Sequence, residues 1–310
     1  MKTIYQELEI HVKKSLERYQ AILEHGVPRG LATGFSLLDV LTNGLLPGRV
    51  YVVASRPSMG KTTLLLTILA EVCIKQKTPS MFFSGDLTIS QIIDRLIFNR
   101  AKIPLCALYD PEYIPNKGEL RRIQRCALDL AGSGLILDDS RDLTIEAIAA
   151  NARAHRAKTG IGFIAIDHLH LIRSESTTPG TPRKCEMARV MREIKSLAQE
   201  LDVPVLVSAQ LKRRADGRLP RIGDIREAGA IEPEADFVGL LHREGTISTK
   251  NYYDLRVAKN SHGPADTVRL IRYPGLQWFE PGPPICNEEE EIEQAWHDYR
   301  YEKDFPPERA

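Results

Sequence analysis

The segment VVASRPSMGKTTLLL, residues 52–66, constrains the fold more than any other part of the sequence. It joins a short apolar run, typical of a β-strand, to a longer one, typical of an α-helix, through a loop that ends in Gly60, Lys61 and Thr62. Apart from Ser55 in place of the first glycine, the loop has the phosphate-binding form G-x-x-x-x-G-K-[ST]. Such a loop needs a strand before it and a helix after it, because backbone N–H groups and the helix N-terminus together hold the phosphates. The sequence therefore predicts an α/β nucleotide-binding fold.

Each part of this loop has a chemical role. Gly60 allows close approach of the backbone, Lys61 can reach the outer phosphates, and Thr62 offers a hydroxyl to Mg²⁺. The alternative is a chance GKT at the start of a helix, and the flanking strand and helix argue against it. The predicted nucleotide-binding residues are Ser58, Met59, Gly60, Lys61, Thr62 and Thr63.

Strands and helices alternate along most of the chain. Short apolar runs predict strands at RVYVVAS, SMFFSG, GLILDD, GFIAID and PVLVSAQ. Between them, helices are expected from Lys61, near 90–101, over 144–158 and over 185–201. This order predicts a mostly parallel sheet with helices on both faces. Beyond Gln210 we expect shorter strands, at FVGLLHR, YYDLRVAK and TVRLIRY.

The two ends of the chain differ from this central part. Apolar residues at Ile4, Leu8, Val12, Leu16, Tyr19 and Leu23 predict an amphipathic helix, which the breakers of GVPRG separate from the main fold. That helix can pack on a neighbouring subunit or on its own domain, and the sequence does not distinguish the two. The last residues are acidic and predict a solvated, mobile tail. We therefore expect a linker segment over 1–30, one domain over 31–280 and a tail over 281–310.

Composition limits the class of protein. The net charge of +1 gives no overall attraction to nucleic acid, so any such binding must come from a local patch or from assembly. Five scattered cysteines indicate thiols in a reducing compartment. No run approaches the ~18 apolar residues of a membrane span. We expect a soluble cytoplasmic protein without a membrane partner.

Two further strand ends carry polar side chains. Asp167 ends the strand of GFIAID, where it can bind the Mg²⁺ shell, although many strands end in Asp only to cap a turn. Gln210 ends the next strand and can sense the γ-phosphate. His168 and His170 have metal-like spacing, but alternate positions at a strand end more often flank a pocket than bind zinc.

With these residues, longer strings point to a known family. SRPSMGKTT, FIAIDHLHLI, SAQLKR and above all DIREAGAIEPEAD, residues 224–236, resemble the RecA-like C-terminal motor domain of DnaB-type replicative helicases over about residues 1 to 278. The resemblance implies a RecA-like P-loop NTPase fold and a homo-oligomer, a hexameric ring. It also implies that the ring hydrolyses ATP with Mg²⁺ and moves 5′ to 3′ along single-stranded DNA in DNA replication. By the same likeness, the helix within residues 1–25 is the linker that docks on the adjacent subunit, and a helicase loader is a partner.

The resemblance also implies roles for particular residues. Asp86 positions the attacking water, Gln210 couples the γ-phosphate to the DNA loop, and Lys259 acts on the neighbouring subunit's site. In the DNA loop itself, a forked guanidinium and a glycine suit contact with phosphates. The basic stretch KRRADGRLPR, residues 212–221, is expected near the DNA, with a solvated loop as the alternative. The predicted DNA-binding residues are Arg226, Glu227, Gly229, Arg213 and Arg214.

Two departures from the family bear on hydrolysis. Asp86 stands where the family usually has a glutamate, and Ser261 stands where it has an arginine that reaches the neighbour's γ-phosphate. They favour an alternative, a hydrolysis-impaired paralogue that serves as a nucleotide-binding partner, loader or regulator of another helicase. Retention of the phosphate loop, Gln210 and DIREAGAIEPEAD favours the enzyme, and makes a recombination-type or clock-type ATPase the least favoured interpretation. The family's N-terminal helical domain is not in the sequence, so we expect no primase-binding role.

Overall fold

The computed structural model describes residues 12, 13, 16, 30–178, 180–215, 218–243 and 251–283. The predicted N-terminal helix lies outside the described residues except for Val12, Lys13 and Leu16, which are helical. The acidic tail also lies outside them, except for its first residues, 281–283. In the described part of the chain, no helix is both long enough and apolar enough to span a membrane.

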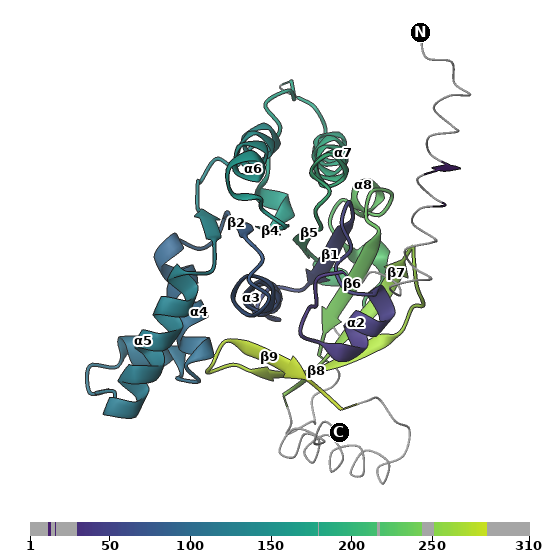
Figure 1. Ribbon diagram of the computed structural model, residues 1–310. Coiled ribbons are helices and arrows are strands. Elements are labelled where there is room, and N and C mark those ends of the chain that lie inside the picture. The colour runs from purple at the N-terminus through teal and green to yellow at the C-terminus, as the bar shows by residue number, and fades with distance from the viewer. Residues whose placement is uncertain are drawn as a thin grey trace.

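A nine-stranded sheet forms the centre of the molecule, with the strand order β3-β2-β4-β5-β1-β6-β7-β8-β9 (Figure 1). Six neighbouring strands are parallel: β1 (Val50–Ser55), β2 (Ser80–Ser84), β3 (Leu135–Asp138), β4 (Phe163–Asp167), β5 (Val205–Gln210) and β6 (Phe237–His242). The remaining three are antiparallel: β7 (Tyr252–Asn260), β8 (Thr267–Tyr273) and β9 (Trp278–Pro281). The mostly parallel sheet is confirmed. The expectation of shorter strands after Gln210 is wrong, because β6, β7 and β8 have six, nine and seven residues and are not shorter than the strands before them.

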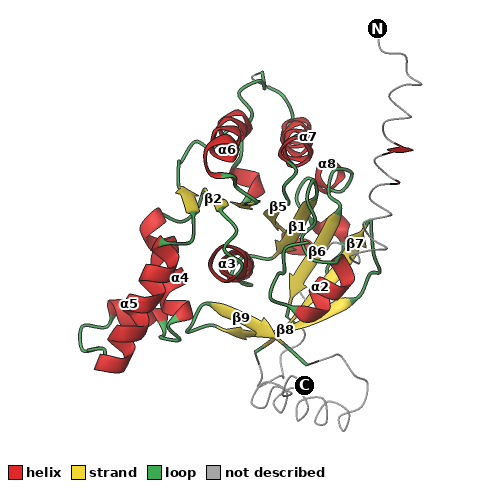
Figure 2. Cartoon of the chain, viewed as in Figure 1, coloured by secondary structure: helices red, strands yellow, loops and turns green. Residues whose placement is uncertain are grey.

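Helices cover both faces of the sheet (Figure 2). One face carries α6 (Ile145–Thr159), α7 (Arg183–Leu201) and the short α8 (Ala228–Ile231). The other carries α2 (Ser36–Thr42), α3 (Lys61–Ala70), which continues into a π-helical turn (Glu71–Lys75), and α4 (Ile89–Arg100). A further helix, α5 (Lys117–Ala131), packs on α4. Both faces of the sheet are therefore buried, as expected for parallel strands.

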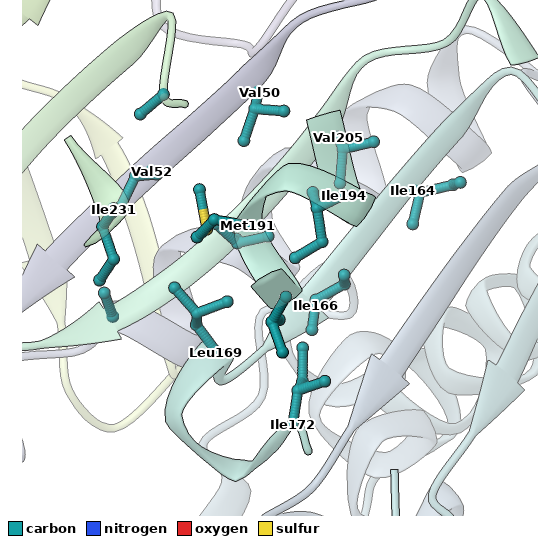
Figure 3. Packing of buried hydrophobic residues seen from close by; sticks show 14 of the residues in the cluster. Val50, Val52, Ile164, Ile166, Leu169, Ile172, Met191, Ile194, Val205 and Ile231 are labelled. Carbon is teal, nitrogen blue, oxygen red and sulfur yellow. The ribbon is translucent and has the colours of Figure 1, made fainter. Parts of the chain in front are cut away.

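Along each central strand, alternate side chains point to opposite faces of the sheet and pack in different hydrophobic clusters. Val50 and Val52 pack with residues of α6 and α7, including Ile194 and Met191 (Figure 3), whereas Tyr51 and Val53 pack towards α3. These residues belong to two separate hydrophobic clusters, one on each face of the sheet, and the side chains of both clusters are almost completely buried. Because burial of a large apolar side chain contributes about 1.5–3 kcal/mol, these clusters fix the strands, and hence the strand ends, in place.

The helices predicted near 90–101, over 144–158 and over 185–201 are confirmed as α4, α6 and α7. Their starts follow ordinary capping chemistry: Thr88 forms a capping box with Gln91 at α4, and the Thr144 hydroxyl accepts from Ala147 N–H at α6. Helices α2 and α5 and strand β9 were not expected from the sequence. Helix α5 was missed although Asn116 and Glu119 form a capping box at its start, and although Ile123, Cys126 and Leu130 fall at helical spacing in the sequence.

The chain returns through β8 and β9 to cover α3, the helix that follows the phosphate loop. Helix α3 has apolar residues on every side and almost no exposed surface, because it lies between the sheet and β9. The Asn99 side chain donates to Gln277 O at 3.0 Å, and Phe279 N–H reaches Thr67 Oγ1 at 3.4 Å. Helix α3 is consequently held by a segment more than 200 residues away in the chain.

Candidate nucleotide-binding site

The ends of the central strands meet at one edge of the sheet. Ser55, the last residue of β1, is in register with Gln210 of β5, and Ser84 of β2 is in register with Asp167 of β4. In open parallel sheets, ligands bind at this carboxyl edge. The structure thus brings together strand ends that lie up to 155 residues apart in the chain (55 to 210).

The phosphate loop has a backbone that requires its small residues. Ser58 and Gly60 both have positive φ, 66° and 95°. A Cβ on Gly60 would lie 3.0 Å from the Phe279 ring and 3.1 Å from Arg272 Nε, so a side chain would be strained in both backbone and space. Arg272 donates to Ser58 O at 3.0 Å. This support from β8 was not expected, because nothing near the loop in sequence indicates it.

The start of α3 offers free donors to a phosphate. Leu64 N–H donates to Gly60 O at 2.9 Å, and the N–H groups of the first turn before it have no intrahelical acceptor. The Thr63 hydroxyl is buried and contacts Gln277 Oε1 at 3.4 Å, so we assign only the Thr63 N–H to the ligand. Lys61 and Met59 are half-buried at the same turn. This is the arrangement that binds anions at helix N-termini.

Thr62 and Asp167 form a pair of oxygen ligands. Thr62 Oγ1 donates to Asp167 Oδ2 at 2.6 Å, and the Ser208 hydroxyl donates to the other carboxylate oxygen. Asp167 has no exposed surface. A hydroxyl and a carboxylate beside a phosphate site fit Mg²⁺, which takes a few protein oxygens and completes its shell with phosphates and water. Ser208 was missed, although its place two residues before Gln210 puts both on one face of β5.

A positively charged side chain, Arg95, also lies near the Asp167 carboxylate. Burial lowers the pKa of the Arg95 guanidinium on α4, and the negative charge of Asp167 acts in the opposite direction. Arg95 was likewise not expected from the sequence, because a single arginine within an amphipathic helix carries no distinctive signal.

Asp86 follows β2 and faces the same edge. Its side chain is 53% exposed, and Oδ2 lies 3.8 Å from His168 Nε2. Gly85 N–H donates to Asp167 O at 2.8 Å, and a Cβ on Gly85 would meet Leu171 at 2.6 Å. The turn that carries Asp86 is therefore packed against Leu171, whose side chain would have to move to admit a larger residue at position 85.

His168 lies between Asp86 and Gln210. The Gln210 amide nitrogen is 3.2 Å from His168 Nε2. Burial, with the charge of Lys61, lowers the pKa of His168 to about 4, so this imidazole is neutral at pH 7. The rings of His168 and His170 have centroids 5.9 Å apart. Among the described residues, no group of three or more His, Cys, Asp or Glu side chains could hold a metal ion.

The candidate DNA loop begins beside Gln210. Arg226 N–H donates to Gln210 O at 3.0 Å, and Arg226 and Gly229 are exposed. Glu227 is half-buried with a positive φ of 53°. The Arg226 backbone therefore joins the predicted DNA loop directly to the end of β5.

The basic stretch before this loop is partly engaged within the fold. Arg213 is exposed, but Arg218 pairs with Asp224 at 2.7 Å and Lys212 Nζ donates to Gly223 O at 3.3 Å. The side chain of Arg214 is outside the described part of the structure. Two of the cluster's basic side chains thus hold the loop's own shape, which lowers the charge free for a polyanion.

Lys259 lies away from the phosphate loop. It pairs with Val238 at the start of β6, and its Nζ donates to Glu232 O at 2.7 Å. Its neighbour Ser261 donates its N–H to Asp236 O, and Asp236 N–H in turn donates to Val50 O at the first residue of β1. One chain therefore does not bring Lys259 to its own phosphate loop.

Comparison with known proteins agrees with this geometry. The family model for the DnaB-like helicase C-terminal domain matches residues 30–281. The Leifsonia xyli replicative DNA helicase DnaB is 38% identical over 253 residues, covering 79% of this chain and 54% of the relative. The Geobacillus stearothermophilus replicative DNA helicase DnaB is 32% identical over 248 residues, covering 78% and 54%. The chain thus spans about half the length of the curated relatives that it matches.

Solved structures show the same fold. One of them, an isolated ATPase domain, has a TM-score of 0.80 at 24% identity, covering 91% of this chain and 99% of that one. A DnaB-like replicative helicase, solved in a study of its interactions with primase, has a TM-score of 0.78 at 24% identity, covering 86% and 66%. The prediction of a RecA-like fold is confirmed.

Proposed function

The chain belongs to the DnaB-like helicase C-terminal domain family, and we propose that it is the motor of a replicative DNA helicase. In this proposal it binds and hydrolyses ATP with Mg²⁺ and moves along single-stranded DNA as a hexameric ring in the cytoplasm. The observation that carries the proposal is the 2.6 Å contact between Thr62 Oγ1, at the start of α3, and Asp167 Oδ2, at the end of β4. It supports a hydroxyl and a carboxylate that share one cation beside a phosphate loop.

We assign the steps of hydrolysis to residues at this edge. The loop residues Ser58, Met59 and Gly60 and the first N–H groups of α3 bind the phosphates, and Lys61 neutralises the β and γ groups. Thr62 and Asp167 would hold Mg²⁺, which supplies charge neutralisation when bound. Asp86 positions the attacking water, and Gln210 senses the γ-phosphate.

We assign the DNA contacts to the loop that follows Gln210. Arg226 and Gly229 are exposed there, where a guanidinium and an N–H can meet phosphates. Arg213, Arg214 and Glu227 are further members of this proposed surface. Lys259 would serve the site of an adjacent subunit, residues 1–30 would link subunits, 31–280 would form the motor, and 281–310 the C-terminal tail. A helicase loader is the expected protein partner.

ATP turnover with and without oligo(dT) tests the proposal. We expect turnover that rises with DNA, and a loss of about a hundredfold or more in Lys61→Ala, because one preorganised donor at developing charge typically contributes that much. Lys158→Ala, an exposed lysine on α6, is the matched control and keeps wild-type turnover. If the wild type does not exceed Lys61→Ala in either condition, the motor proposal fails. Binding of a fluorescent ATP analogue then decides whether the hydrolysis-impaired alternative, which the relatives' names do not favour, still stands.

A further inference from the structure

Two histidines flank Gln210 in a way that the proposed function does not use. His168 and His170 follow β4, one just before and one within the 3₁₀ turn Leu169–Leu171. Both side chains are under 10% exposed, at 6% and 9%. One ring contacts the Gln210 side chain and the other contacts its backbone, so the two imidazoles hold the same residue from different sides.

His170 joins Gln210 to the loop that carries Arg226. Its Nδ1 accepts from Gln210 N–H at 3.4 Å, which assigns the ring proton to Nε2. Nε2 lies 3.2 Å from Arg226 O and 3.2 Å from Glu227 Oε2. Burial lowers the pKa of His170, and the bond to Arg226 O acts in the opposite direction. A neutral ring with one donor and one acceptor is therefore fully used by these partners.

The loop needs such a contact to keep its shape. Glu227 has a φ of 53°, in the left-handed region that a glutamate rarely adopts. A residue in this region persists only when surrounding contacts hold it there. The contact from His170 Nε2 to the Glu227 carboxylate is one, and the bond from Arg226 N–H to Gln210 O is another. Movement of Gln210 would disturb both.

His168 connects the other side of Gln210 to the hydrolysis site. Its Nδ1 is buried without a hydrogen-bond partner among the described residues, so Nε2 alone makes polar contacts. That atom lies 3.2 Å from the Gln210 amide and 3.8 Å from Asp86 Oδ2. Because the Gln210 amide nitrogen can only donate, His168 Nε2 accepts from it and cannot also donate to the Asp86 carboxylate. A Gln210 that turns towards a γ-phosphate therefore gives up its bond to His168.

We propose that His168 and His170 are positioning residues that link the nucleotide site to the DNA loop through Gln210. In this bridge, His168 holds the Gln210 side chain beside Asp86 until Gln210 turns towards the γ-phosphate, and His170 passes the position of Gln210 to Arg226 and Glu227. The inference rests on the proposed function, since it assigns the nucleotide to one end and DNA to the other. The inference adds to the proposed function two residues that couple nucleotide binding to DNA binding.

Equilibrium binding measures this coupling directly. The dissociation constant of fluorescent oligo(dT) is measured by anisotropy on the full chain, with Mg²⁺ and either a slowly hydrolysed ATP analogue or ADP. The ratio of the two constants is the coupling factor, which is typically about 5-fold to 150-fold where two sites are linked. The variants are His170→Leu, which removes both ring nitrogens, and His170→Gln, whose amide can again bond Arg226 O and Glu227. His155→Leu, a half-buried histidine on α6, is the control.

We expect a wild-type ratio of at least about fivefold, which His170→Leu lowers to within about twofold of unity and His170→Gln largely restores. Loss of histidine packing alone would weaken DNA binding equally in both nucleotide states and would not be rescued by glutamine. If His170→Leu binds both ligands and keeps the wild-type ratio, or if the wild type binds both without any coupling, the bridge is wrong while the proposed function stands. If the wild type binds neither the analogue nor oligo(dT), the proposed function itself fails and the bridge falls with it.

Discussion

Lengthening the Asp86 side chain should speed ATP hydrolysis. Asp86 Oδ2 lies 3.8 Å from His168 Nε2, which is about 0.9 Å beyond an ordinary N–H···O contact of about 2.9 Å. Glutamate adds one carbon–carbon bond of about 1.5 Å, enough to close that gap. The 53% exposed carboxylate has solvent around it, so the added methylene meets no packed core. Asp86→Glu therefore brings the carboxylate further into the site without repacking the fold.

The size of the expected increase in kcat follows from the sensitivity of catalysis to the position of the catalytic group. A displacement of about 1 Å can change a rate about a hundredfold when positioning carries the step. We expect Asp86→Glu to raise kcat by about tenfold to a hundredfold, of which each tenfold corresponds to about 1.4 kcal/mol of barrier. KM for ATP should change little, because the carboxylate acts on the water and not on the bound nucleotide. The substitution thus separates chemistry from binding.

Steady-state ATPase with saturating Mg-ATP, with and without oligo(dT), gives the answer. Asp142→Glu, in an exposed loop, is the control for a glutamate elsewhere, and Asp86→Asn removes the base while keeping the shape. If Asp86→Asn is as fast as the wild type, Asp86 does not position the water. If Asp86→Asn is slow but Asp86→Glu is no faster than the wild type, Asp86 acts but its shortness does not limit the rate.

Two further predictions concern the cation and the support of the loop. Thr62→Val keeps the volume of the side chain but removes the hydroxyl beside Asp167, so Mg²⁺ should no longer strengthen binding of a fluorescent ATP analogue, a loss of about tenfold or more that titrations with and without EDTA measure. Phe279→Ala should lower the free energy of unfolding by about 3–5 kcal/mol, because the ring is buried and packs edge-on against Tyr253 at 5.6 Å. Urea unfolding measures this cost, and Leu128→Ala, at a 74% exposed leucine, should cost no more than about 0.5 kcal/mol.

The order of strands and helices could be predicted because local patterns carry it. The apolar runs around Ser55, Asp167 and Gln210 end in polar residues, and parallel strands bring such ends to one edge whatever the strand order. That rule, together with the phosphate-loop motif that carries Thr62, brings Thr62 and Asp167 to the same edge. Helix α5 is carried by the same local rules, although it was not expected, because its capping box and the helical spacing of Ile123, Cys126 and Leu130 both lie in the sequence.

The contacts that support the phosphate loop could not be predicted, because they join segments distant in the chain. Arg272 reaches Ser58 O and Phe279 packs over Gly60 only after β8 and β9 have folded back over α3. Local periodicity describes a strand's faces and carries no information on which loop the strand will meet. The contacts of His168 and His170 with Gln210 could not be predicted for the same reason. In the sequence, the spacing of the two histidines gave only a metal-like pattern.

The two small residues of the phosphate loop are not equally replaceable. Ser55 has no exposed surface, yet its hydroxyl is satisfied by Arg56 O at 2.9 Å and its carbonyl accepts from Leu211 N–H at 2.9 Å. A side chain at this last position of β1 therefore costs little, because the strand backbone is ordinary there. Gly60 differs, since its φ of 95° and the Phe279 ring 3.0 Å from its absent Cβ both exclude a side chain. The residues that pack on the phosphate loop, and not the consensus sequence of the motif, therefore determine at which position the site requires glycine.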